Sequence, residues 1–262
     1  MKTLAITNQK GGVGKTTTCV NLAASLASQG KRVLLVDLDP QGNATTGSGI
    51  DKAHLKHSVY HVLIGANSLQ DVIISSENGG YDVAPSNRDL AGAEVELVNE
   101  IAREIRLKTA IIKLGDAYDY VLLDCPPALN LVTVNALTAA NSVMIPMQCE
   151  YYALEGLSDL VNTIKKVRMH LNPILEIEGL LRTMLDSRNM LALQVSEQLF
   201  KHYGKKVYDT VIPRNIRLAE APSYGLPALV YDKSSKGAQA YLTLAQEVIA
   251  RNESVNRQPS NV

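Results

Sequence analysis

The sequence predicts an α/β protein with an open, mostly parallel, twisted sheet and helices on both of its faces. Two observations favour this fold class. Short runs rich in Val, Ile and Leu recur along the chain, as in strands that are buried on both faces. Stretches with helical periodicity separate these runs, and strand–helix–strand alternation is typical of parallel sheets with right-handed crossovers.

The expected elements follow in chain order. Strands are expected at residues 2–8, 32–37, 81–85, 120–124, 142–148, 177–184 and 206–212. Helices are expected at residues 16–29, 131–140, 154–169, 191–203 and 238–251. Gly30 stands just after the first helix, where a left-handed residue commonly ends a helix. We expect one domain over 1–252 and a flexible polar tail over 253–262.

Composition excludes some classes of protein. Of the 262 residues 46% are hydrophobic and 20% are charged, which suffices for a globular core without disulfides or metals. Cys19, Cys125 and Cys149 show no paired spacing, so buried reduced thiols and a cytosolic location are expected. No signal-peptide pattern and no apolar run near the roughly 20 residues that span a bilayer is present. We expect a soluble cytoplasmic protein.

A glycine-rich loop joins the first expected strand to the first expected helix. It reads Lys10, Gly11, Gly12, Val13, Gly14, Lys15, Thr16 and Thr17. Glycines allow consecutive N–H groups to point at phosphate oxygens, and the following helix N-terminus favours an anion. Lys15 is expected to reach the β- and γ-phosphates of ATP and Thr16 to hold Mg²⁺. Gln9 replaces the usual first glycine and Lys10 is an additional lysine, so this is the deviant form of the phosphate loop.

Carboxylates end two of the expected strands. Asp37 and Asp39 follow one apolar run and Asp124 follows another. Ligands of parallel sheets bind at the carboxyl ends of the strands, beside the phosphate loop. We therefore expect Asp124 to support Mg²⁺ through a water, Asp39 to position the attacking water and Asp37 to assist with the metal, although the division between Asp37 and Asp39 stays open. The alternative is that these acids cap the helices that follow.

These motifs together resemble the ParA/Soj family of chromosome- and plasmid-partitioning ATPases, within the larger ParA/MinD group. The resemblance covers the ordered chain and rests on the phosphate loop, residues 37–43, residues 124–127 and the block 212–223. The block 212–223 is the most specific of these. Because the loop begins at Lys10, the match is to the small form without an N-terminal helix-turn-helix.

The resemblance implies further properties. It implies a homodimer with ATP sandwiched between subunits, in which Lys10 acts in catalysis on the partner's nucleotide and Gly12 lies at the junction. It places Pro213 and Asn215 around the adenine. It implies non-specific binding of double-stranded DNA through Arg188 and Arg217, a ParB-type centromere-binding partner, slow intrinsic hydrolysis and association with the nucleoid.

Local charge gives partial support for DNA binding. The chain carries 26 Lys+Arg and 26 Asp+Glu, but residues 182–236 contain nine basic and five acidic side chains. This excess of +4 suits a phosphate-binding face, and it is also small enough to be a fluctuation on a solvated surface.

Three other functions remain as alternatives. A MinD-like positioning ATPase on the membrane would need an amphipathic basic helix at the C-terminus, where 242–251 has the pattern of a core-packing helix. A small-molecule ligase or kinase would leave the block 212–223 unexplained. A metal-cluster ATPase would need paired cysteine ligands.

Overall fold

A single sheet runs through the molecule. The computed structural model describes residues 1–150 and 153–257. Its strands are β1 (Lys2–Ile6), β2 (Val33–Asp37), β3 (Ile74–Ser76), β4 (Tyr81–Ala84), β5 (Tyr120–Asp124), β6 (Ser142–Gln148), β7 (Glu176–Leu185) and β8 (Val207–Pro213). They lie in the order β3-β4-β2-β5-β1-β6-β7-β8, and every neighbouring pair is parallel except β3 with β4. The predicted fold class is confirmed.

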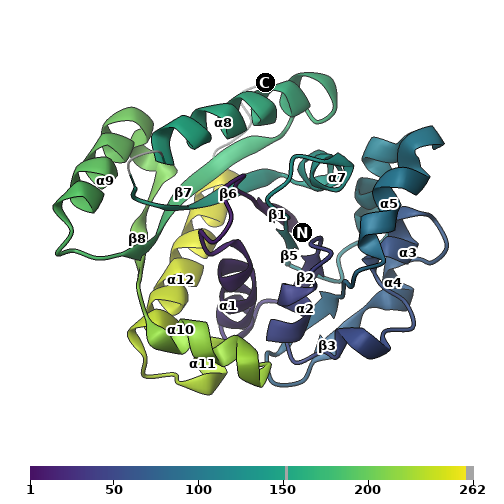
Figure 1. Cartoon of the computed structure of the whole chain (residues 1–262), viewed down its shortest axis with the longest axis horizontal. Coiled ribbons are helices and arrows are strands. Elements are labelled where there is room, and N and C mark those ends of the chain that lie inside the picture. The colour runs from purple at the N-terminus through teal and green to yellow at the C-terminus, as the bar shows by residue number, and fades with distance from the viewer. Residues whose placement is uncertain (151–152, 258–262) are drawn as a thin grey trace.

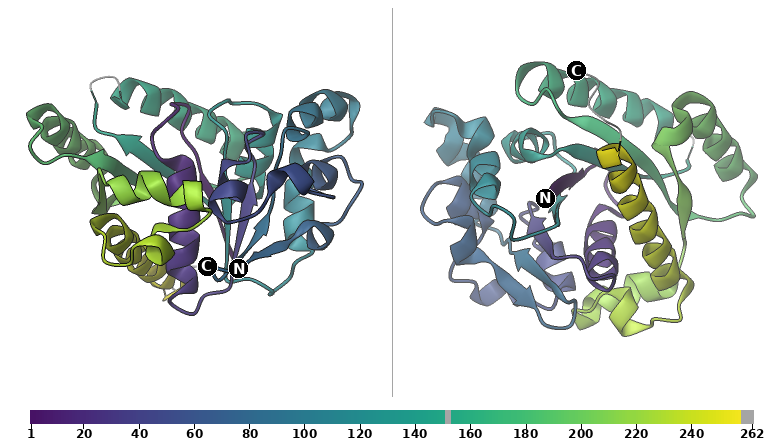
Figure 2. Two further views of the ribbon diagram at one scale, coloured as in Figure 1. Left: turned by 60° about the horizontal axis from the view of Figure 1, so that its bottom comes forward. Right: turned by 180° about the vertical axis from the view of Figure 1, so that it is seen from behind.

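Helices cover both faces of this sheet (Figures 1 and 2). The α-helices are α1 (Lys15–Ala27), α2 (Asn43–Gly47), α3 (Val59–Leu63), α4 (Leu69–Val72), α5 (Leu90–Glu96), α6 (Arg106–Ile112), α7 (Leu131–Ala139), α8 (Ala153–His170), α9 (Met190–Tyr203), α10 (Ile216–Glu220), α11 (Ala228–Tyr231) and α12 (Lys236–Arg257). Short 3₁₀ turns are η1 (Lys52–His54), η2 (Leu97–Asn99), η3 (Arg103–Ile105), η4 (Gly204–Lys206) and η5 (Ala221–Tyr224).

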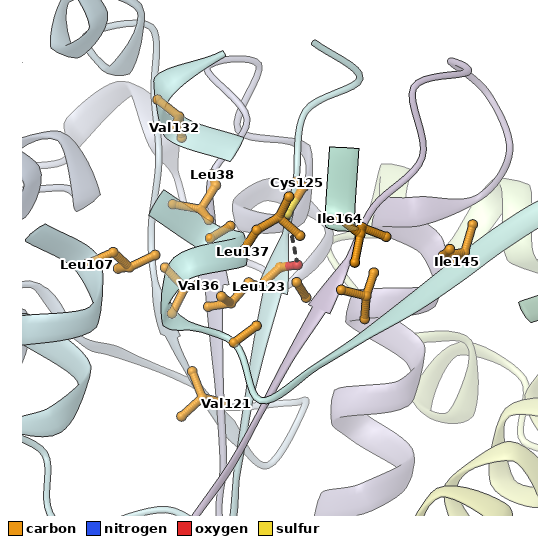
Figure 3. Close-up of a cluster of buried hydrophobic side chains, with 14 of the residues drawn as sticks. Val36, Leu38, Leu107, Val121, Leu123, Cys125, Val132, Leu137, Ile145 and Ile164 are labelled. Atoms are coloured by element: carbon orange, nitrogen blue, oxygen red, sulfur yellow. Dashed lines mark hydrogen bonds between the residues drawn. The ribbon is translucent and has the colours of Figure 1, made fainter. Parts of the chain in front are cut away.

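Alternation along the strands builds two cores. In β5, Val121 and Leu123 face the core beneath α3 to α9, whereas Tyr120 and Leu122 face the core beneath α1 and α12. Figure 3 shows the first of these cores, with side chains of β2, β5 and β6 meeting those of α6, α7 and α8. Burial on both faces explains why the strands read as continuous apolar runs.

Each of the seven predicted strands is present, and β3 was missed. It has three residues and pairs antiparallel to β4 at the edge of the sheet. Such a short strand has too few residues for a period of two to show. Helices α2 to α6 were also not predicted, because four to seven residues form only one or two turns.

The C-terminal helix is longer than expected. It was predicted over 238–251, and α12 continues to Arg257. Residues 253–257 of the predicted tail are therefore helical, and 258–262 lie outside the described residues. The prediction of one domain over 1–252 stays a prediction.

Candidate nucleotide-binding site

Two glycines shape the loop between β1 and α1. Gly12 has φ of +73° and Gly14, the residue before α1, has φ of +89°. Other residues adopt such angles only with strain, so both positions require glycine. The Gly14 carbonyl accepts from the N–H of Thr18 at 2.9 Å, which starts the helix directly at the end of the loop. The chain therefore delivers the helix N-terminus and the glycine-rich turn to one point, as the motif predicts.

Neighbouring strands hold the loop in place. The buried Val13 accepts a hydrogen bond at its carbonyl from Thr183 Oγ1 of β7, at 2.8 Å. Asn8 donates from Nδ2 to the carbonyl of Pro146 in β6, at 2.8 Å, and its Oδ1 accepts from the N–H of Lys10. These contacts join the loop to β6 and β7 and fix its position against the sheet.

The two lysines of the loop occupy different environments. Lys15 is only 7% exposed, and its Nζ donates to the Lys10 carbonyl at 3.1 Å. Burial lowers the pKa of Lys15, while Asp124 and other nearby groups oppose that shift. The Lys10 side chain instead lies at the surface, where Nζ forms an ion pair with Glu150. The Lys15 side chain therefore lies inside the site, whereas the Lys10 side chain lies outside it at the surface.

Strand register brings two acids together. Asp37 in β2 and Asp124 in β5 are paired positions, and Ile6 of β1 pairs with Asp124 on the other side. Both carboxylates are fully buried. The Thr45 N–H and hydroxyl donate to Asp37 Oδ2 at 2.8 and 2.7 Å, and the Asp39 N–H donates to Oδ1 at 3.1 Å. Burial raises the pKa of Asp37 to about 6, against the effect of these hydrogen bonds.

Asp39 lies beyond the end of β2 and is partly exposed. Its Oδ1 accepts from the N–H of Gln41 at 2.9 Å, so this oxygen bonds within its own turn. Both Asp37 oxygens already accept hydrogen bonds, so Asp37 shapes the turn that carries Asp39. The structure thus separates the two acids, with Asp39 nearer solvent.

Asp124 is the carboxylate that can still accept a hydrogen bond. Its Oδ1 accepts from the Cys19 thiol at 3.4 Å, and its buried Oδ2 has no hydrogen-bond partner among the described residues. Burial and the neighbouring Asp37 raise the pKa of Asp124, while Thr16 and Cys19 act in the opposite direction. A buried unpaired acceptor is costly, and a water held by a cation would satisfy it.

The donor set therefore fits Mg²⁺. Within residues 1–150 and 153–257, no cluster of three or more His, Cys, Asp or Glu side chains could hold a metal. Magnesium does not need such a cluster, since it keeps several waters and binds through substrate phosphates and one or two protein oxygens. Thr16 and Asp124 are suited to that role.

The segment after β8 closes the far side of the site. Pro213 and Asn215 line a cavity of about 180 Å³ together with Gly14 and Thr17 of the loop and Met184 of β7. Asn215 also caps α10, because its Oδ1 accepts from the N–H of Arg217 at 3.0 Å. The structure thus brings the two predicted adenine residues next to the phosphate loop. A larger hollow of about 580 Å³ lies at the opposite ends of the strands, far from these motifs.

The two predicted DNA contacts follow adjacent strands. Arg188 lies between β7 and α9, and Arg217 lies in α10 after β8. Both side chains are exposed and ion-paired, Arg188 with Asp186 at 2.8 Å and Arg217 with Glu220 at 2.8 Å. Arg182, which contributes to the local charge excess, is buried. Its guanidinium donates to Ser196 and to carbonyls of β8, so this arginine cannot serve a phosphate-binding face.

Sequence reasoning missed the residues that support the site. Cys19, Thr45 and Thr183 contact the acids or the loop from other elements, and nothing in their local sequence marks them. The three cysteines are buried and free, as predicted.

A phosphate loop joins the parallel strand β1 to a helix, and buried acids end the adjacent strand β5 and the next strand, β2. This arrangement defines a P-loop nucleotide-binding protein. Residues 1–177 match the protein-family model described as an AAA domain. The chain is 58% identical to the sporulation initiation inhibitor protein Soj of Bacillus subtilis, over 95% of this chain and 98% of that protein. It is 53% identical to the chromosome partitioning protein ParA of Caulobacter vibrioides, over 96% and 95%. The chain belongs to the ParA/Soj family of chromosome-partitioning ATPases.

Solved structures of similar proteins share this fold. A cobyrinic acid a,c-diamide synthase from Mycobacterium smegmatis, with bound ADP and magnesium, has a TM-score of 0.86 and 38% identity, covering 100% of this chain and 99% of that one. The cell division ATPase MinD of Pyrococcus furiosus has a TM-score of 0.79 and 26% identity, covering 95% and 98%. Among the described residues, no helix has both the length and the apolar character needed to cross a membrane.

Proposed function

We propose that the chain is an ATP-dependent dimerising switch. In the dimer it binds DNA without sequence preference, and ATP hydrolysis releases it, which drives partitioning of a chromosome or plasmid with a ParB-type partner. The observation that carries this proposal is the different placement of the two loop lysines: Lys15 is buried in its own site, whereas Lys10 extends from the loop surface.

ATP and Mg²⁺ are the cofactors. When bound, they supply the phosphoryl group and the divalent charge that neutralises the phosphate oxygens. The N–H groups of residues 11–16 and Lys15 bind the phosphates, Thr16 and Asp124 hold the metal, and Asp37 assists by fixing the turn before Asp39. Asp39, near the exposed side, orients the attacking water. Pro213 and Asn215 position the adenine.

Lys10 completes the site of the partner subunit. Gly11 and Gly12 are exposed, and a Cβ atom at either position would meet nothing within 4 Å in this chain. The loop surface is thus open for the approach of a second subunit, with Gly12 at the junction. A lysine supplied by the partner would act on the γ-phosphate as an arginine finger does, so hydrolysis depends on dimerisation. Intrinsic turnover is expected to be slow until the ParB-type partner completes the site.

DNA binding is assigned to Arg188 and Arg217 in the dimer. Both are exposed, and a phosphate oxygen would replace Asp186 at Arg188 and the two carboxylates, Glu220 and Asp232, at Arg217. Exposed ion pairs of this kind are weak, so the exchange costs little. The protein would act in the cytoplasm, associated with the nucleoid through these contacts.

Two alternatives make different demands on the fold. A MinD-like membrane role would need an apolar face on the C-terminal helix that is free to insert. In α12, Tyr241, Leu244, Ala245 and Val248 are buried against α1 and β8, so this part of the helix belongs to the core. The name of the M. smegmatis structure favours a small-molecule synthase as the second candidate. A synthase would turn over with its small substrate and would not need DNA.

The test is the molecular mass in solution with ATP, ADP or no nucleotide. We expect the wild-type protein to dimerise with ATP only. Lys15→Ala should lose nucleotide binding and stay monomeric, and Lys10→Ala should bind ATP yet fail to hydrolyse it. A Lys10→Ala protein that hydrolyses ATP at the wild-type rate would contradict the assigned role of Lys10. Lys31→Ala, a lysine outside the site, is the matched control.

A further inference from the structure

Cys19 connects the phosphate-loop helix to the metal-binding strand. It lies in α1, four residues after Lys15, and is fully buried. Its Sγ is 3.4 Å from Oδ1 of Asp124, at the end of β5. Cys125, by contrast, has its Sγ 3.7 Å from a strand carbonyl, that of Leu123. Cys19 is therefore the cysteine whose thiol touches a carboxylate of the site.

The two oxygens of Asp124 are unequal because of this contact. Oδ1 accepts from the thiol, and the buried Oδ2 has no hydrogen-bond partner among the described residues. A carboxylate with one oxygen held has a fixed orientation, and its second oxygen is then presented at a fixed place. The hydrogen bonds of the neighbouring Asp37 come from Asp39 and Thr45, and none joins it to Asp124 among the described residues.

We propose that Cys19 is a positioning residue for magnesium binding, which holds Asp124 so that Oδ2 meets the hydration shell of the ion. The inference rests on the proposed function, in which Mg²⁺ and ATP bind beside Thr16 and Asp124. It assigns a role to a side chain that does not itself contact the metal or the nucleotide.

The size and chemistry of the thiol set the expected effect of substitutions. Cys19→Ala and Cys19→Val remove the thiol donor to Oδ1, so the Asp124 carboxylate is less firmly held, although Thr16 still lowers its pKa. Partners of metal-binding groups commonly contribute about 10- to 100-fold in metal affinity, and a weak thiol donor belongs at the lower end of this range. Cys19→Ser keeps a donor on a shorter bond, so it should restore part of the effect.

The experiment separates metal binding from folding. The affinity for a fluorescent ATP analogue is titrated at increasing Mg²⁺, and once in excess EDTA. For Cys19→Ala and Cys19→Val we expect the half-saturating Mg²⁺ concentration to rise about tenfold, with affinity in EDTA unchanged. Cys19→Ser should stay within about threefold of wild type. Cys149→Ala, which removes a buried thiol elsewhere, should match wild type.

Three results would overturn the inference. One is an unchanged Mg²⁺ dependence in the Ala and Val variants, and another is a Ser variant that is as impaired as both. An equal loss of affinity in EDTA and in Mg²⁺ would also overturn it, since that pattern indicates a packing role. If wild-type protein showed no Mg²⁺-dependent ATP binding, the proposed function itself would fail.

Discussion

Lys10 and Lys15 lie five residues apart in the chain, yet Lys10 is exposed and Lys15 is buried. Lys15 is buried beside carboxylates, and burial lowers its pKa. Lys10 is exposed and pairs with Glu150. Motif spacing predicts both lysines, because phosphate-binding loops need fixed glycine and lysine positions. It does not predict Glu150, which is 140 residues away in the chain.

The sequence likewise predicts the positions of the acids but not their hydrogen-bond partners. Their location at strand ends could be predicted from the sequence, since the apolar runs that precede them are clear. The sequence could not predict which acid keeps an oxygen without a hydrogen bond. That outcome depends on the hydrogen bonds from Thr45 to Asp37 and from Cys19 to Asp124. Only the folded chain shows that both Asp37 oxygens accept hydrogen bonds, while Asp124 Oδ2 has no partner within residues 1–150 and 153–257.

The role of Asp39 leads to a prediction. Asp39→Ala should bind ATP with near-wild-type affinity and remain dimeric, because the Asp39 side chain bonds within its own turn and serves the attacking water. Hydrolysis should fall by about 100-fold or more. Single-turnover hydrolysis and solution mass measure both properties. Asp51→Ala, at an exposed acid outside the site, is the control, and an Asp39→Ala variant that hydrolyses freely would contradict the assignment.

At the scale of elements, β8 is the edge strand that brings Pro213 beside the phosphate loop. Its N–H groups are partly satisfied by α12, where the Glu247 carboxylate accepts from the N–H groups of Asp209 and Thr210 at 3.0 Å. It also accepts from the Thr210 hydroxyl and pairs with Arg251. The sequence predicts both elements through their periodicity, but not this contact between them.

Removing the Glu247 carboxylate should destabilise the protein. Glu247→Ala is expected to lower the free energy of unfolding by about 1–3 kcal/mol, because the N–H groups of β8 and Arg251 are deprived of a charged acceptor. For a chain of this size, each kcal/mol corresponds to about 2–4 °C in Tm. Thermal unfolding measures the change, and Gln246→Ala, at the exposed neighbouring position, should stay within about 0.5 kcal/mol.

The effect of Glu247 should also depend on pH. Burial opposes the charged form, but hydrogen bonds from Thr210 and its neighbours lower the pKa of Glu247 overall. A lowered pKa means that its stabilisation is present above the unfolded value of about 4.3 and is lost as the pH falls through the folded value. The difference between wild type and Glu247→Gln should therefore shrink below about pH 4. A difference that stays constant as the solution is acidified further would contradict this account.

At the scale of the whole molecule, the strand order explains the position of the site. β1 lies between β5 and β6, so the loop after β1 opens beside the acids of β5 and β2. The segments after β7 and β8 supply Arg188 and Arg217 at the carboxyl ends of the same sheet (Figure 1). Alternating apolar runs predict a parallel sheet, whereas the order of its strands depends on packing between distant segments.

Surface charge gives a prediction at this scale. Arg217→Glu should weaken binding to DNA and reduce the slope of log affinity against log salt by about 0.9 for each phosphate that the protein no longer neutralises. ATP-dependent dimerisation should be unaffected, because Arg217 is exposed on α10 and forms its ion pairs with Glu220 and Asp232. Arg32→Glu is the matched control, as another exposed arginine in an ion pair, just before β2. Failure of Arg217→Glu to dimerise would mean that this residue is structural.

The proposed switch is tested most directly by binding to random-sequence duplex DNA with ATP, with ADP and without nucleotide, each titrated with salt. We expect binding with ATP only, which weakens steeply as salt increases and does not depend on the DNA sequence. Absence of binding in all three states, with ATP-dependent dimerisation intact, would contradict the account and direct attention to a membrane or small-molecule role.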